Sequence, residues 1–283
     1  MKNTVKIKCP AKINLTLEIV NRREDGFHNI KSIMQMISLY DFLTISIEQG
    51  SENKILLSGT SDEIPYNEKN LVYKAAELFL QKAGISNLKI KIHIEKNIPI
   101  AAGLAGGSTD AAGTLFGLNY LLKIFDEKQL HEMCAKLGSD LNVCLRGGCT
   151  LATSRGEITE KIPCINSPVT LIKPKYFGIS AGEAYKKYAL KELKPQNNMT
   201  EKMLEAIKNN ADIKPYLYND LEYAIFDDYI ELQKIKQVLP DSIMSGSGST
   251  YFLLKKEAKA FNEEDYIKFE NLYFIPTGVD LAD

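Results

Sequence analysis

The stretch with the most chemical content is a glycine-rich segment, PIAAGLAGGSTDAAG, which covers residues 99–113. Three of the five residues 103–107 are glycines, so a ligand can come close to the main-chain N–H groups and a positive φ costs little there. An apolar run follows and predicts a helix that begins with Ser108 as its N-cap. Because the free N–H groups and the dipole of a helix N-terminus favour anions, this segment predicts a phosphate-binding loop.

A glycine-rich turn can also serve only to connect a strand to a helix, and this one is neither a Walker A motif nor the G-x-G-x-x-G dinucleotide fingerprint. Phosphate binding is favoured by what surrounds the glycines. Two hydroxyls and a carboxylate, from Ser108, Thr109 and Asp110, stand at one helix start directly after an alternating strand over residues 88–95. Hydroxyl and carboxylate oxygens beside phosphates are the ligands that Mg²⁺ prefers.

Two further sets of residues are candidates for chemistry. Residues 13–19 alternate with the period of a strand that has one buried face. Lys12 and Asn14 stand two apart in this strand, so both side chains point the same way, either into a site or into solvent. Asp140 follows a predicted helix end, where it could be a turn residue or could accept a hydroxyl proton in phosphoryl transfer at the mouth of a core strand. Asp110 is the alternative base, although a carboxylate at a helix start more naturally meets the dipole or a metal.

The segment RREDGFHNI, residues 22–30, predicts a turn at Asp25 and Gly26, followed by Phe27 and His28. Such a turn can lie at the surface with its aromatic ring folded back on the core. An aromatic ring beside a histidine can also stack on a flat base and hydrogen-bond its edge. These residues taken alone leave both interpretations open.

The composition is that of a globular protein with balanced charges. The 283 residues are 45% apolar and 25% charged, which suits about two domains. A formal charge of -1 argues against a nucleic-acid-binding surface. The N-terminus lacks an apolar signal region and no apolar stretch reaches membrane-spanning length, so a cytosolic protein without membrane contact is expected. The spacing of the five cysteines and three histidines predicts neither a disulfide framework nor a zinc site.

The hydrophobic periodicity predicts an α+β or α/β first half and a small α+β second part. In the first half it indicates strands over residues 13–19, 42–47, 55–58 and 88–95 and helices over residues 70–83 and 127–137. After a softer stretch it indicates strands over residues 169–173 and 251–254 and helices over residues 180–190 and 229–238.

Four separated motifs together resemble the GHMP kinase superfamily, which includes galacto-, homoserine, mevalonate and phosphomevalonate kinases. They are PAKINLTL, PIAAGLAGGSTDAA, LGSDLNV and MSGSGS, in the superfamily's order. The resemblance implies a two-domain α+β fold. A domain of the ribosomal-protein-S5 domain 2-like type would cover residues 1–161, and a ferredoxin-like domain would cover residues 162–283, with the site in the cleft between them.

The resemblance also implies an activity. The γ-phosphoryl group of ATP, with Mg²⁺, would pass to an alcohol, and RREDGFH and the stretch around LGSDLNV favour a cytidine diphosphate sugar alcohol of isoprenoid precursor synthesis as the acceptor. The chain would act as a monomer or weak homodimer. The alternatives are a kinase for a smaller alcohol such as homoserine or mevalonate, a nucleotide-binding regulator without turnover, and an RNA-binding relative. A small aliphatic acceptor offers no base to stack, and the charge balance argues against RNA.

Site residues follow from the motifs position by position. Lys12 and Asp140 match the catalytic pair, in which Asp140 would accept the hydroxyl proton while Lys12 orients that hydroxyl and keeps Asp140 ionised. The phosphate loop matches Pro99, Ile100, Ala101, Ala102, Gly103, Leu104, Ala105, Gly106, Gly107, Ser108 and Thr109, with Ser108 and Thr109 nearest the phosphates and Ser108 the implied Mg²⁺ ligand. The adenine region matches Asn70, Leu71 and Lys96. The acceptor side matches Asn14, Phe27, His28 and Tyr185, with Phe27 where a tyrosine is usual.

Overall fold

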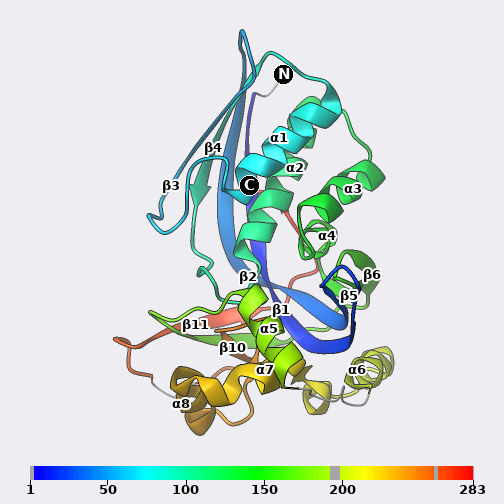
Figure 1. Ribbon diagram of the computed structural model, residues 1–283, viewed down its shortest axis with the longest axis vertical. Helices are drawn as coiled ribbons and strands as arrows, with labels where there is room; N and C mark the ends of the chain where they lie inside the picture. The colour runs from blue at the N-terminus through cyan, green and yellow to red at the C-terminus, as the bar shows by residue number, and fades with distance from the viewer. Residues whose placement is uncertain (1–2, 192–197, 258–260, 283) are drawn as a thin grey trace.

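Two β-sheets, each accompanied by helices, make up the chain in the computed structural model, which describes residues 3–191, 198–257 and 261–282 (Figure 1). This confirms the predicted α+β fold. Among the helices of the described residues, none combines the length and the apolar character needed to cross a membrane.

The larger sheet has eight strands, with the order β12-β1-β2-β4-β3 along its main path and with β5, β6 and β8 attached to β2, β5 and β1. Its helices all cover one face, with α2 against β1 and β2 (Figure 1). The strands are β1 (Thr4–Arg22), β2 (His28–Gln49), β3 (Lys54–Gly59), β4 (Leu88–Glu95), β5 (Cys149–Ser154), β6 (Ile158–Ile162), β8 (Tyr218–Asn219) and β12 (Asp280–Leu281). The helices are α1 (Leu71–Ala83), α2 (Gly106–Leu122), α3 (Glu127–Leu137) and α4 (Leu141–Arg146).

Local capping explains why α1 and α3 form where the periodicity predicted them. The side chain of Asn70 accepts from the N–H of Val72, and Gly84 ends α1 in the left-handed region with φ of 64°. The α3 helix opens with a capping box between Asp126 and Gln129. Both ends of α1 are thereby fixed by residues that are readable in the sequence.

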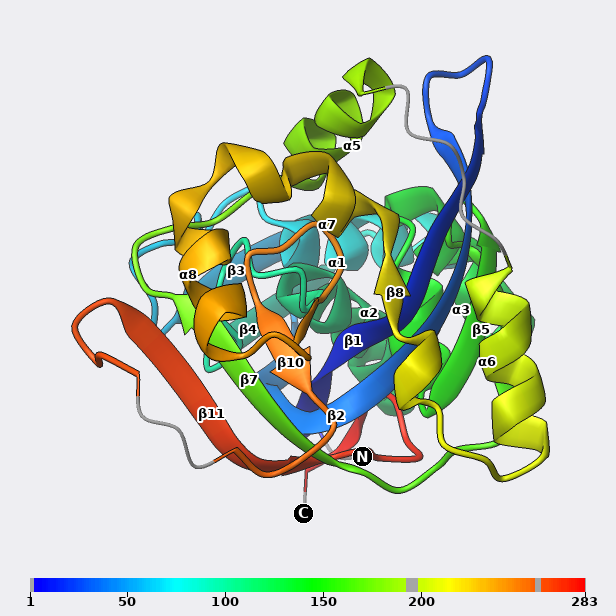
Figure 2. The same ribbon diagram turned by 90° about the horizontal axis from the view of Figure 1, so that it is seen from below.

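The smaller sheet has the order β11-β7-β10-β9, and α8 packs on its β7 strand (Figure 2). Its strands are β7 (Pro168–Pro174), β9 (Ile243–Met244), β10 (Tyr251–Leu253) and β11 (Tyr266–Tyr273). The helices of this part of the chain are α5 (Ala181–Leu190), α6 (Met199–Lys208), α7 (Asp220–Ile225) and α8 (Ile230–Val238), with 3₁₀ turns at 214–216 and 226–228. Of these, α6 packs on β1 and β2 of the larger sheet. The division at residue 161 stays a prediction, because β8 and β12 return from the second half of the chain to pair with β1.

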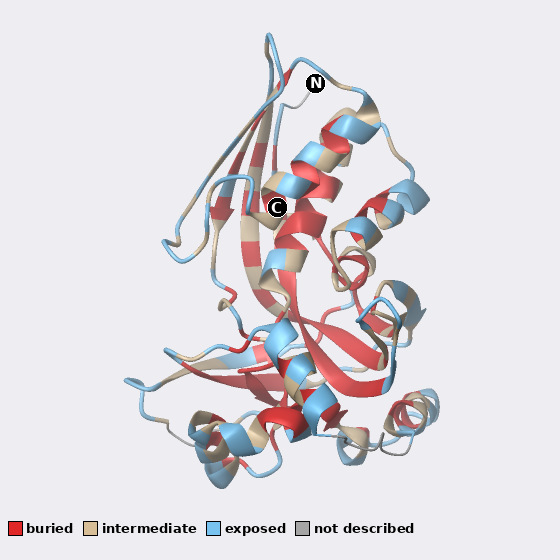
Figure 3. Cartoon of the chain, in the orientation of Figure 1, coloured by how far each residue is buried: buried red, intermediate tan, exposed pale blue. Residues whose placement is uncertain are grey.

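Strand β1 is buried on both faces over residues 11–19, so the expectation of a single buried face was wrong (Figure 3). The polar residues at alternate positions are held by hydrogen bonds instead of by water. The amide of Asn14 donates to Oγ of Ser32 at 2.8 Å, and the carboxylate of Glu18 accepts from the first N–H groups of α6. A polar pattern that resembles a solvated strand face therefore lies inside the molecule, between the two halves.

Candidate active site

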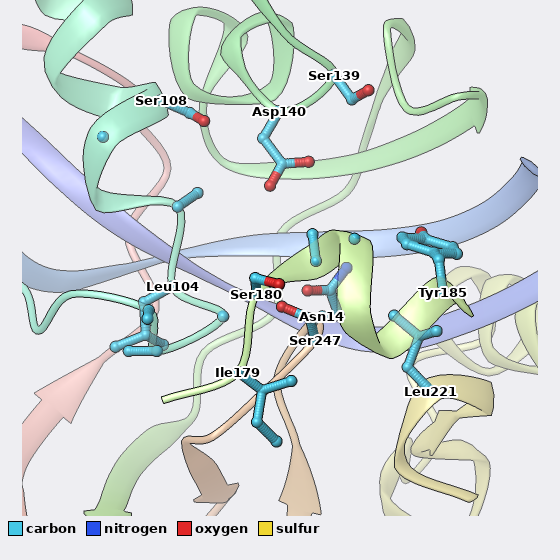
Figure 4. Close-up of a pocket in the computed structure, with 18 of the residues that line it drawn as sticks. Asn14, Leu104, Ser108, Ser139, Asp140, Ile179, Ser180, Tyr185, Leu221 and Ser247 are labelled. Carbon is cyan, nitrogen blue, oxygen red and sulfur yellow. The ribbon is translucent and has the colours of Figure 1, made fainter. Parts of the chain in front are cut away.

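One cavity of about 950 Å³ gathers residues from both halves of the chain. Its walls come from β1, the glycine-rich segment, the α3–α4 connection, the start of α5 and the segment MSGSGS at residues 244–249. In Figure 4, Ser108 and Asp140 stand on one wall, and Asn14, Ser180 and Ser247 stand across from them. The arrangement places the glycine-rich segment and the candidate base around a common space.

The glycine-rich segment leads into α2 differently from the expectation. The helix begins at Gly106, its N-cap is Ala105 with φ of 59°, and no side chain caps it, so Ser108 is a helical residue and the predicted N-cap was wrong. The first N–H groups of α2 are thus left for a ligand, and Gly106 and Gly107 line the cavity. An uncapped helix N-terminus at a cavity wall is a ready anion-binding site.

The two glycine-rich segments interlock at Gly103. This residue has φ of +72°, and a Cβ there would lie 1.9 Å from the carbonyl oxygen of Ser245. Oγ of Ser245 donates to the Gly103 carbonyl at 3.0 Å, and the amide of Asn219 donates to the carbonyls of Met244 and Gly246 at 2.7 and 2.8 Å. Only glycine fits this crossing, which fixes the first loop against the second.

Lys12 and Asp140 both line the cavity and contact each other there. Nζ of Lys12 lies 3.6 Å from Oδ2 of Asp140, and it also donates to Oδ1 of Asn14 at 2.7 Å and to the Gly103 carbonyl at 2.9 Å. The Lys12 side chain is 4% exposed, and that of Asp140 is 29% exposed. Asp140 occupies the N-cap position of the short helix α4, so the expected core strand after it was wrong. The carboxylate can therefore reach a substrate while the ammonium is held in place.

A buried ion cluster lies behind the start of α2. Nζ of Lys96 contacts the carboxylates of Asp41 and Asp110, and the Lys96–Asp110 distance is 3.0 Å. Burial, together with the neighbouring charge of Asp41, raises the pKa of Asp110 to about 7 despite Lys96. Asp41 also accepts from the N–H groups of Asn97 and Ile98, which lead into the glycine-rich segment. The cluster anchors the entry to this loop.

Aromatic rings line the end of the cavity that lies away from the start of α2. The ring of His28 stacks on Tyr185 with centroids 5.2 Å apart, and the ring of Phe27, which is 53% exposed, lies 5.0 Å from the guanidinium carbon of Arg155. Partial burial and the nearby charge of Arg22 lower the pKa of His28. This end offers flat apolar faces and a neutral imidazole.

The structure brings most of the predicted site residues to this cavity, with two exceptions. Leu71 at the start of α1 and the fully buried Thr109 do not line it. The residues that the sequence analysis did not single out include Arg22, Ser139, Arg155, Lys186 and Ser247. Of these, Arg22, Ser139 and Ser247 lie in the segments RREDGFHNI, LGSDLNV and MSGSGS, whereas Arg155 and Lys186 carry no local signal.

Comparison with known proteins identifies the fold. Residues 70–148 match the GHMP kinases N terminal domain. A homoserine kinase from Cytophaga hutchinsonii superposes with a TM-score of 0.76 at 18% identity, covering 100% of this chain and 98% of its own, which shows the shared fold. The fold is that of a GHMP kinase.

Closer relatives narrow the class. A 4-diphosphocytidyl-2-C-methyl-D-erythritol kinase of Syntrophomonas wolfei is 36% identical over 99% of this chain and 100% of its own, and one of Clostridioides difficile is 37% identical over 98% of both chains. The crystal structure of a 4-(cytidine 5'-diphospho)-2C-methyl-D-erythritol kinase superposes with a TM-score of 0.72 at 31% identity, covering 88% of this chain and 89% of its own. The chain belongs to the 4-diphosphocytidyl-2-C-methyl-D-erythritol kinase family.

Proposed function

We propose that the protein transfers the γ-phosphoryl group of ATP to the 2-hydroxyl of 4-diphosphocytidyl-2-C-methyl-D-erythritol, in the methylerythritol phosphate route to isoprenoid precursors. One observation carries the proposal: the Lys12–Asp140 pair lies in a single cavity between an uncapped helix N-terminus and a set of aromatic rings. The uncapped helix N-terminus suits phosphates, and the aromatic rings suit a nucleobase. The relatives named above support the same substrate.

The reaction needs a positioned hydroxyl and a stabilised phosphoryl group. Asp140 accepts the proton as the acceptor oxygen attacks the γ-phosphorus, and the bond to the ADP oxygen breaks. The ammonium of Lys12, 3.6 Å from the Asp140 carboxylate, would orient the same hydroxyl. The N–H groups at the start of α2 stabilise the charge on the transferring group. Most of the acceleration then comes from positioning and electrostatics.

The residues at the start of α2 also fit Mg²⁺. This ion keeps several waters and takes one or two protein oxygens besides those of the phosphates. The hydroxyl of Ser108 lines the cavity, and Oδ1 of the buried Asp110 has no hydrogen-bond partner among the described residues. We assign these two oxygens to the ion, which when bound would offset the charge on the phosphates.

The aromatic end is assigned to the cytosine ring. Phe27 and Tyr185 would hold the base between them, and His28 would reach its edge once its ring leaves Tyr185. Phe27 keeps the stacking surface of the tyrosine that is usual in the family and lacks its hydroxyl. Asn14, beside Lys12, would face the acceptor, and Asn70 and Lys96 would lie toward adenine.

An ADP-release assay with three acceptors tests the proposal. We expect kcat/KM for the diphosphocytidyl substrate to exceed that for homoserine or mevalonate by at least about 10³-fold, because only the first offers a base to stack and each correctly placed polar contact adds discrimination. Comparable turnover of a small alcohol would move the protein to another branch of the GHMP kinases. ATP binding without turnover of any acceptor would contradict the kinase assignment.

A further inference from the structure

In the part of the chain that the structure describes, five lysine and arginine side chains line the cavity, and they fall into two sets. Lys12 and Lys96 are both largely buried and contact carboxylates, Lys12 at Asp140 and Lys96 at Asp41 and Asp110. The other three, Arg22, Arg155 and Lys186, are not used by the chemistry described above. We call these three residues the cationic rim.

Each member of the cationic rim accompanies one of the aromatic rings. The guanidinium carbon of Arg155 lies 5.0 Å from the ring centroid of Phe27. Arg22 is paired with His28 across the β1–β2 ladder, and Lys186 follows Tyr185 in α5. The positive charge is therefore concentrated at the end of the cavity assigned to the base, away from the start of α2 where ATP is placed.

The rim carries little compensating negative charge. Nε of Arg155 lies 3.6 Å from Oε1 of Glu157, a distance too long for a strong hydrogen bond. For Arg22 and Lys186 the described part of the chain offers no carboxylate in ion-pair contact. Three cations thus converge on one end of the cavity, and one carboxylate, that of Glu157, lies near them. This excess of positive charge favours an anionic ligand there.

We propose that Arg155, Arg22 and Lys186 bind the diphosphate that links the cytidine to the sugar alcohol, with Arg155 as the main contact. This rests on the proposed function, because it takes the base as already stacked at this end. One face of Phe27 is covered by the guanidinium of Arg155, so the base uses the other face. The N–H groups at the edge of the guanidinium stay free to donate to a phosphate as the chain of the substrate leads toward Asp140.

Titration calorimetry without ATP, using cytidine, CMP and CDP as ligands, tests the inference. The wild type should bind CDP more tightly than cytidine, by a margin that shrinks as salt rises. Arg155→Ala should lower CDP affinity about tenfold more than cytidine affinity, as expected for a partly exposed charge-assisted contact. Arg22→Ala and Lys186→Ala should show the same selective loss at smaller size. If Arg155 only supports the Phe27 ring, Arg155→Ala should lower the affinities for cytidine, CMP and CDP equally.

Two neighbouring cations serve as matched controls. Nε of Arg146 donates to Oγ1 of Thr159, and Lys187 forms an ion pair with Asp228. Neither Arg146 nor Lys187 lines the cavity. Arg146→Ala and Lys187→Ala should leave the CDP-to-cytidine affinity ratio unchanged. An equal loss for cytidine and CDP in Arg155→Ala, or the same loss in the controls, would overturn the role of the rim. If the wild type binds cytidine tightly but shows no preference for CDP, the role of the cationic rim is also overturned, although the cytosine site is still supported. If the wild type binds neither ligand, the proposed function itself is contradicted.

Discussion

Nζ of Lys12 and Oδ2 of Asp140 lie 3.6 Å apart, although one residue comes from the middle of β1 and the other from the N-cap position of α4. The lysine is fixed by two further acceptors, Oδ1 of Asn14 and the Gly103 carbonyl. Among the described residues, the Asp140 carboxylate has no comparable set of partners, and it stays partly exposed at the cavity (Figure 4). The pair therefore joins a held cation to a carboxylate that can meet a substrate.

Asp140→Asn should lower kcat by about 10²- to 10⁴-fold, the usual range for a lost general base, with little change in the affinity for ATP. The substitution keeps the shape of the side chain and removes the proton acceptor. Single-turnover kinetics measures the chemical step, and nucleotide titration measures ATP binding. Near-normal turnover would transfer the base role to Asp110, the only other carboxylate among the described residues that line the cavity.

Gly103→Ala should destabilise the protein by more than about 2 kcal/mol and abolish activity, because the new Cβ meets the Ser245 carbonyl at 1.9 Å in a left-handed backbone. Gly107→Ala is the matched control, since nothing lies within 4 Å of its added Cβ. Thermal unfolding should give a lower melting temperature for Gly103→Ala than for Gly107→Ala. Equal melting temperatures would show that the crossing of the two loops is loose.

Asn219→Asp should lower kcat by about 10- to 100-fold, because the aspartate cannot donate to the carbonyls of Met244 and Gly246 and the loop beside Lys12 shifts. Asn142 is a matched control, since its amide is also buried and donates to the Glu157 carbonyl outside the cavity. Asn142→Asp should lose stability while its folded fraction keeps kcat. If the activity per folded molecule falls equally in both variants, Asn219 does not have a positioning role.

Tyr185→Ala should raise KM for the cytidine substrate by about 10- to 100-fold and leave KM for ATP almost unchanged, in line with the value of one base–aromatic stack. Tyr176→Ala removes a ring that is 88% exposed and outside the cavity, so it should change neither constant. Steady-state kinetics with each substrate varied in turn gives both values. A rise confined to the KM for ATP would place adenine at this end of the cavity.

The contribution of Asp110 to stability should fall as the pH rises from about 4 to about 7, because the folded chain keeps a proton on Asp110 over this range and the unfolded chain releases it near its ordinary pKa of 3.8. The slope from this group is at most about 1.4 kcal/mol per pH unit. Urea unfolding at several pH values measures it, and Asp110→Asn should flatten the curve. An unchanged curve in that variant would assign the pH dependence to other groups.

Much of the fold was predictable because it depends on local signals. The cap at Asn70, the left-handed Gly84 and the strict alternation over residues 88–95 mark their elements directly. The two-domain α+β class followed from the order of four motifs and not from periodicity alone. The N-cap of α2 was mispredicted because Ala105, without a capping side chain, takes the position that local preference gives to Ser108.

The remainder depends on contacts that a sequence does not display. Burial of both faces of β1 requires the second half of the chain to close over it, so Lys12 and Asn14 keep the pattern of a solvated face. Arg155 reaches Phe27 from a turn 128 positions away in the chain. No local pattern marks such a residue, because its position is set by the pairing of β5 with β2.

Phosphorus NMR of the reaction with ATP and 4-diphosphocytidyl-2-C-methyl-D-erythritol shows whether the protein phosphorylates this alcohol and whether Asp140 is needed for the transfer. We expect a new phosphomonoester resonance, appearing as ADP forms, with the wild type and not with Asp140→Asn, while homoserine and mevalonate give none. A product signal from homoserine or mevalonate alone, or ATP bound without any new monoester, would contradict the proposed function.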